Sequence, residues 1–127
     1  MRNYRDLLVW EKAHRLTLTV YKNTRSFPID ERFGLTSQIR RASASIAANL
    51  AEGCGRRSDG EMGRFTQIAM GSGAELSYHL LLARDLGLLE AEIYQILGSA
   101  LGGIMRMMSA LSQKIRGHAS DEKRLVL

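Results

Sequence analysis

Apolar residues recur along this chain at intervals of three and four, the spacing that places them on one face of an α-helix. The first such segment spans residues 8–24, and the stretch "SFPID" ends it because Pro28 cannot continue a helix. Its apolar stripe consists of Val9, Ala13, Leu16 and Val20. Its other side is predicted to carry a basic stripe of Lys12, Arg15, Lys22 and Arg25.

The second segment begins at Asp30 or at Leu35 and ends at Gly53, where "GCGRR" supplies a glycine stop. Its helical wheel divides into three stripes rather than two. The apolar stripe contains Leu35, Ile39, Ala42, Ile46 and Leu50. A stripe with mostly very small side chains contains Arg40, Ala44, Ala47, Ala48 and Ala51. The polar stripe contains Gln38, Arg41, Ser45, Asn49, Glu52 and Arg56.

The third segment starts with Ser58 and Glu61, which have the spacing of a capping box, and Gly87 is its natural stop. Glycines 71 and 73 lie inside it and each costs about 1 kcal/mol relative to alanine, so we expect a neighbouring helix to approach them closely. Its apolar positions are Phe65, Ile68, Ala69, Ser72, Leu76, Leu80 and Ala83.

The fourth segment runs from Glu90 to Arg116, and its glycines, residues 98, 102 and 103, are also expected to serve helix packing. Its apolar stripe contains Ile93, Leu97, Ala100 or Leu101, Ile104, Met108, Leu111 and Ile115. Four helices of about 20 residues with short connections predict an all-α fold, an antiparallel up-down four-helix bundle. We assign residues 1–117 to this single domain and expect residues 118–127 to be a frayed tail of mixed charge.

The positive charge is concentrated at the start of the chain. Of 18 Lys and Arg residues against 13 Asp and Glu, nine basic and four acidic residues fall within residues 1–41, and the remaining residues balance. A local basic excess indicates a polyanionic partner such as RNA or DNA. The alternative is a surface tuned for solubility.

The sequence favours a cytoplasmic protein that does not enter the membrane. Its single cysteine cannot form an internal disulfide, and its N-terminal segment is too charged for a signal peptide. The longest uncharged run, Ile93 to Met105, is shorter than the roughly 20 residues that cross a bilayer. Arg56 and Arg57 are close enough in sequence to lower the pKa of Cys54, although an inert, packed thiol is the favoured interpretation.

No catalytic arrangement stands out. We expect His14 to be exposed, His79 to be packed or hydrogen-bonded near the core, and His118 to lie in the tail. None has a neighbouring cysteine, aspartate or serine at a spacing that indicates a nucleophile and its base. Glu75 and His79 lie four residues apart, but a di-metal bundle needs a second such pair. The sequence therefore predicts a protein that is not an enzyme and holds no metal or cofactor. A metal enzyme using this pair is the lesser alternative, which elemental analysis would test.

Two sets of residues are candidates for function. Phosphate contacts are predicted for Lys12, Arg15, Lys22, Arg25, Arg40 and Arg41, with Arg56 and Arg57 secondary. A structural polar seam between helices is favoured over a ligand surface for Gln38, Ser45, Asn49, Glu52 and Glu75. Arg40, Arg56 and Arg57 are expected to be exposed, whereas Arg41 is either exposed or paired with Glu52 or Glu75. The alanine stripe predicts close helix packing, within the subunit or between subunits.

These motifs resemble a known family. The stretches "LLVWEKAHRL", "VYKNTRSFP" and "ERFGLTSQIRRASASIAANLAEGCGRRSDGEMGRFTQIAMGSGAEL" are similar to the four-helix-bundle proteins encoded in intervening sequences of bacterial 23S ribosomal RNA genes. The resemblance covers residues 4–89. Relatives often carry proline at position 47, where this chain has alanine, so the second helix should be less interrupted. The motif residues are Val9–Trp10, Phe27–Pro28, Gly34–Leu35, Gln38, Arg40, Arg41, Asn49, Ala51, Glu52, Gly53, Arg64–Phe65, Gly71–Ser72 and Glu75–Leu76.

The resemblance implies a homopentamer of four-helix subunits without enzymatic activity. It also implies kinship to the accessory variability proteins of diversity-generating retroelements, basic pentamers that bind nucleic acid and a reverse transcriptase. Together with the charge pattern, it predicts a homo-oligomeric scaffold that binds structured nucleic acid. The alternative is a protein–protein adaptor whose basic surface meets an acidic partner.

Overall fold

The fold is all-α, as the sequence predicts. The computed structural model describes the backbone of residues 2–126 and the side chains of residues 2–118. No strand occurs within that range, and two short 3₁₀ turns cover Tyr4–Asp6 and Ile29–Glu31. The four helices are α1 (Leu8–Asn23), α2 (Leu35–Cys54), α3 (Asp59–Asp85) and α4 (Ala91–Val126).

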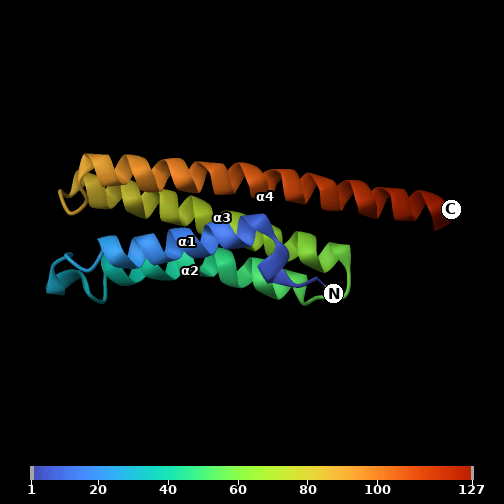
Figure 1. The fold of residues 1–127 in the computed structure, drawn as a ribbon, viewed down its shortest axis with the longest axis horizontal. Coiled ribbons are helices and arrows are strands. Elements are labelled where there is room, and N and C mark those ends of the chain that lie inside the picture. Colours follow the sequence, from blue (N-terminus) through green and yellow to red (C-terminus); the bar gives the residue numbers. More distant parts are fainter. Residues whose placement is uncertain (1, 127) are drawn as a thin grey trace.

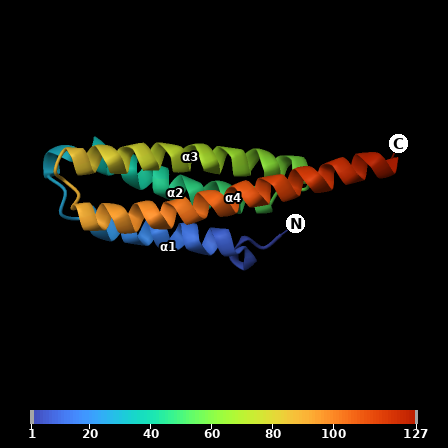
Figure 2. The same cartoon turned by 90° about the horizontal axis from the view of Figure 1, so that it is seen from above.

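The helices form an antiparallel up-down bundle (Figure 1). In sequence order each runs back alongside the one before, and α4 closes the arrangement by packing against α1 as well as α3. The view from above places α1 and α3 on opposite sides (Figure 2). Each helix therefore has two packed neighbours, and α1 and α3 lie diagonally across the core.

Local signals set most helix ends. At the start of α3, the Ser58 hydroxyl accepts a hydrogen bond of 3.1 Å from the Glu61 amide. At its end, Gly87 has a φ of 77°, in the left-handed region that glycine occupies cheaply. The Leu88 amide then donates to the Ala83 carbonyl at 2.9 Å, which closes a Schellman turn. Both predicted boundaries of α3 are thus explained by capping groups.

Of the two predicted starts of the second helix, Asp30 and Leu35, the structure has Leu35, and the Leu35 amide donates to the Glu31 carboxylate at 2.9 Å. One helix boundary differs from the sequence prediction. The fourth helix continues past Arg116 to Val126, beyond the ends of the other helices (Figure 1). A single glycine at 117 weakens a helix by about 1 kcal/mol, which does not suffice to stop it. Most side chains of the predicted tail lie outside the described residues, so its fraying stays a prediction.

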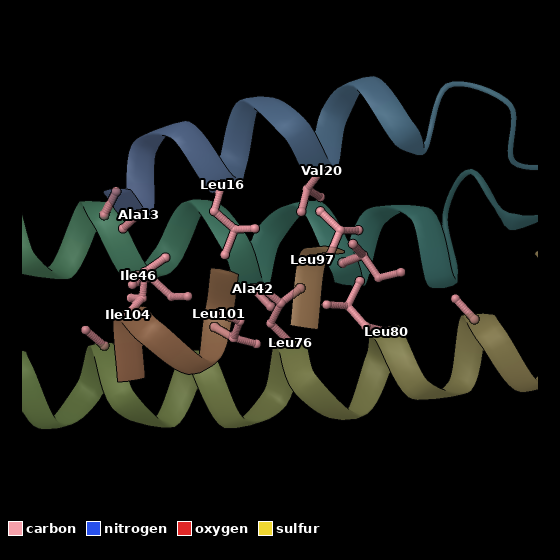
Figure 3. Packing of buried hydrophobic residues seen from close by; sticks show 14 of the residues in the cluster. Ala13, Leu16, Val20, Ala42, Ile46, Leu76, Leu80, Leu97, Leu101 and Ile104 are labelled. Atoms are coloured by element: carbon pink, nitrogen blue, oxygen red, sulfur yellow. The ribbon is translucent and has the colours of Figure 1, made fainter. Parts of the chain in front are cut away.

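The predicted apolar stripes form the core. Side chains from all four helices meet between the ribbons (Figure 3). From the sequence, Ala100 and Leu101 are alternatives for one core position of α4. Leu101 is buried and Ala100 is exposed, so Leu101 occupies that position. Ile68 departs from its predicted core position and is 41% exposed. The second helix runs without interruption through Ala47, which is itself buried.

The glycines divide into packed and open positions. A methyl group on Gly73 would overlap the sulfur of Met105, so here a neighbouring helix does approach closely, as expected. At Gly71 and Gly98 the same methyl group would meet open space. A methyl group on Gly102 or Gly103 would contact only the guanidinium of Arg106, which belongs to the same helix. The expectation of helix packing is therefore wrong within the subunit for every one of these glycines except Gly73.

Candidate functional site

The basic stripe of α1 is exposed along its whole length. Lys12, Arg15 and Lys22 of α1 have exposed side chains, as does Arg25, two residues beyond the end of the helix. Arg15 donates to the Glu11 carboxylate at 2.8 Å, but the Arg15 side chain is 75% exposed. A surface ion pair of this kind contributes little to stability, so Arg15 can readily exchange Glu11 for another anion. All four cations are therefore available to an anionic partner.

A groove of about 730 Å³ lies between α1 and α4, beside this stripe. Its floor is apolar and contains the buried side chains of Leu16, Leu97 and Ile104. None of the described residues that line it is Asp or Glu. The lining consists of Lys12, Arg15, Leu16, Thr19, Ile96, Leu97, Ser99, Ala100, Gly103, Ile104, Arg106, Met107 and Ala110.

The groove adds a cation that sequence reasoning missed. Arg106 of α4 faces Lys12 and Arg15 of α1 across the groove, and its guanidinium lies over the glycine surface of α4. The face of α4 that borders the groove can be recognised in the sequence. Residues 96, 100, 103, 107 and 110 form a second stripe of apolar and small residues at helical spacing, next to the core stripe of α4.

Arg40 does not project from the surface as expected. It is half-buried, and its Nε donates to the Thr24 hydroxyl at 2.9 Å. The guanidinium also lies 4.7 Å from the centre of the Tyr21 ring, within the range of a cation–π contact. A second guanidinium nitrogen donates to the Tyr21 carbonyl at 3.4 Å, so the charged end has polar partners at the end of α1. Arg40 therefore joins two helices and is a weak candidate for phosphate contact.

Arg56 and Arg57 are exposed, as predicted. Arg56 donates to Glu52 at 2.8 Å, and its guanidinium lies 4.9 Å from the centre of the Phe65 ring. Its charge is thus shared with an acidic neighbour. These two arginines sit at the end of α2, and Arg56 is already engaged within the subunit.

The predicted polar seam lies between α2 and α3. A small cleft of about 170 Å³ brings together Gln38, Arg41, Ser45 and Glu75 with two further lining residues, Ala42 and Ser72. The hydroxyls of Ser45 and Ser72 are 2.8 Å apart.

Two other members of the predicted seam behave differently. Asn49 donates to the Ser45 carbonyl at 2.8 Å and to its hydroxyl at 3.0 Å. Glu52 pairs with Arg56 and does not line the cleft. Arg41 is exposed at the cleft, and within the described part of the chain no ion pair joins it to Glu52 or Glu75.

Comparison with known proteins identifies the family. Residues 5–110 match the family described as 23S rRNA-intervening sequence protein. The chain belongs to this family. A crystal structure from Bacteroides thetaiotaomicron, described as a protein with unknown function from the S23 ribosomal protein family, has the same fold with a TM-score of 0.74. The two sequences are 21% identical, and the match covers 82% of this chain and 97% of that one. No curated protein matches the chain.

The histidines of this chain lie apart from one another, and the buried Nδ1 of His79 has no hydrogen-bond partner among the described residues. His14 is exposed and stacks on Trp10, with ring centres 5.1 Å apart. His79 is half-buried and packs against the Tyr78 ring at 5.8 Å, and His118 is exposed. Among the described residues, no group of three or more His, Cys, Asp or Glu side chains is placed to hold a metal ion. No helix in the described range is long and apolar enough to span a bilayer.

Cys54 is a packed thiol. It is 1% exposed and contacts Met62 and Ile115 in a small cluster at the end of the bundle. Burial raises its pKa above the ordinary value of 9.0, and the cation that opposes this shift is Arg2. The suggestion that Arg56 and Arg57 lower this pKa is therefore wrong, and the inert interpretation is favoured.

The burial of Cys54 predicts slow thiol chemistry. We expect a disulfide-exchange reagent at neutral pH to label Cys54 roughly 100-fold more slowly in the folded protein than in denaturant, because reaction needs local opening. The raised pKa has a second effect. The unfolded thiol ionises near pH 9.0 while the folded one stays protonated, so stability should be complete below that pH and fall above it. Labelling at the denatured rate would contradict the packed thiol.

Proposed function

We propose that this protein is a homo-oligomeric, non-enzymatic scaffold of the cytoplasm that binds structured nucleic acid through the basic face of α1. The observation that supports this most is the run of exposed cations on α1, Lys12, Arg15 and Lys22, which continues to Arg25 just beyond the helix. Arg106 of α4 extends it across the groove. Lys12 and Lys22 are separated by about 15 Å along the helix.

The length of this basic stripe suits a nucleic-acid backbone. Phosphates of one strand of B-DNA follow each other every 3.4 Å or so along the helix axis, so a basic stripe of this length lies over several of them. The expected contacts are to phosphate oxygens, which position the protein without reading sequence. A homo-oligomer, a pentamer by family resemblance, would repeat the stripe and convert a weak contact into a strong one through avidity.

The test uses a labelled RNA hairpin and fluorescence anisotropy at low and moderate salt. We expect binding by the unmodified protein to weaken steeply with salt. The variant Lys22→Glu/Arg25→Glu should bind much less, with a log–log salt slope smaller by about 1 per cation removed. These two residues do not line the groove, so the change leaves the groove intact. A matched control, Lys114→Glu/Arg116→Glu, changes the net charge equally on exposed residues of α4.

The control variant distinguishes RNA binding at a local surface from an effect of the overall net charge. Equal loss in both variants would mean that only the overall charge matters and would contradict a site on α1. Absence of RNA binding even at low salt would end the nucleic-acid proposal. The adaptor alternative would then take its place, because the apolar floor of the groove with its cationic rim also fits an acidic protein surface.

A further inference from the structure

The α1–α4 groove is an apolar surface without a partner in the isolated subunit. Ile96, on its edge, is 56% exposed, and Ala100 and Ala110 are also exposed. The face of α4 that borders it is built from small residues, which let another helix approach closely. Of its three cations, Arg15 is paired with Glu11, which does not line the groove. Among the described residues, no ion pair engages Lys12 or Arg106, and no carboxylate lines the groove. The groove therefore fits a convex helix that presents apolar side chains and negative charge.

The outer face of α3 has these properties. Residues 68, 71, 75 and 78 follow each other at intervals of three and four, which places them on one side of the helix. Ile68 is 41% and Tyr78 58% exposed, so both present apolar surface to the outside of the helix. Gly71 between them opens onto free space, and Glu75 supplies an exposed carboxylate.

We propose that the α1–α4 groove of one subunit receives the outer α3 face of a second copy of this chain. The inference rests on the homo-oligomer of the proposed function and adds the two surfaces that meet. Ile68 and Tyr78 contact the apolar groove, Gly71 allows close approach to α4, and Glu75 faces Arg106. The lengths agree, because Ile68 to Tyr78 spans about 15 Å of helix and Ile96 to Met107 about 16 Å.

The positions of the two surfaces also suit repeated association. Because α1 and α3 lie diagonally in the bundle, the groove and the α3 face are on different sides of the subunit (Figure 2). Each copy can accept one neighbour and insert into another. A contact between two different surfaces closes into a ring when its rotation divides a full turn. Lys22 and Arg25 lie outside the groove and stay available to nucleic acid.

The charge contact is tested by swapping its two ends. Light scattering measures the mass of the unmodified protein, of Glu75→Lys, of Arg106→Glu and of the double variant. Each single variant places like charges opposite each other and should raise the subunit dissociation constant on the order of 100-fold. The double variant restores opposite charges and should recover much of the association.

Gly71→Leu provides a second, steric test. Leucine has room at this position within the subunit, so the variant should fold with unchanged circular dichroism, yet it should block the approach of the second copy. Gly98→Leu is the matched control, because Gly98 also opens onto free space in the subunit but does not line the groove. It should keep the mass of the unmodified protein.

The possible failures are distinguishable. An oligomer that tolerates Gly71→Leu and both charge reversals would overturn these surfaces while leaving the homo-oligomer intact. A monomeric unmodified protein would overturn the homo-oligomer of the proposed function together with this inference, and a different protein would then be the occupant of the groove. RNA binding is measured separately with Lys22→Glu/Arg25→Glu, whose residues lie outside the groove.

Discussion

Replacing Leu76 with alanine should lower the free energy of unfolding by about 3 kcal/mol. Leu76 of α3 is fully buried and lies among side chains from the other helices (Figure 3). Removing its three terminal carbon atoms loses their transfer free energy and leaves a cavity that rigid neighbouring helices fill only in part. Urea denaturation followed by circular dichroism, at one fixed protein concentration, measures the change.

The matched control is Leu18→Ala, the same chemical change on the outside of α1. Leu18 is 57% exposed, so its loss should change stability by less than about 0.5 kcal/mol. If the two variants proved equally stable, the packing of α3 into the core would be wrong. A fall in the m-value of Leu76→Ala would point instead to a change in the denatured state.

Gly73→Leu should destabilise the bundle by about 2 kcal/mol or more, although leucine is the better helix former. The reason is the close contact between α3 and α4, where even a methyl group on Gly73 would overlap the sulfur of Met105. A whole leucine side chain must push Met105 and Leu101 aside or separate the two helices. The thermal midpoint, at fixed protein concentration, reports the loss as a drop of several degrees.

Two companion variants identify the cause. Gly98→Leu places the same residue at an open glycine of α4, where the gain in helix propensity should raise stability by up to about 1 kcal/mol. Adding Met105→Ala to Gly73→Leu should recover part of the loss, because it vacates the space that leucine needs. Loss of stability in both leucine variants, without rescue, would mean that helix packing is not the reason.

The periodic part of the fold is predictable from the sequence. The apolar stripes of α1 and α2 are buried at every predicted position, because one stripe per helix is enough to decide which side faces the core. Capping residues placed both ends of α3. The end of α4 was not predictable from Gly117, since glycine lowers helix stability only slightly. Ile68 was misplaced because it borders the true stripe at nearly the correct spacing.

The candidate site was predictable only where it lies on one helix. The exposure of the α1 cations follows from their position opposite the apolar stripe. Arg40 lies between helices, and its contacts with Thr24 and Tyr21 depend on how closely α1 and α2 pack. Arg106 belongs to the same surface as Lys12 and Arg15 only because the chain folds back over three helices. A single helical wheel contains no such information.

The closure of the bundle by its last helix has a consequence for biosynthesis. Among the described residues, three of the four helix interfaces join consecutive helices, and the fourth joins α1 to α4, the first and last helices. During translation α1, α2 and α3 leave the ribosome first. The 36 residues of α4 need about 2 to 7 s more at usual elongation rates. For that time the apolar side chains of α1 that α4 covers stay exposed, which makes the nascent three-helix stage prone to aggregation.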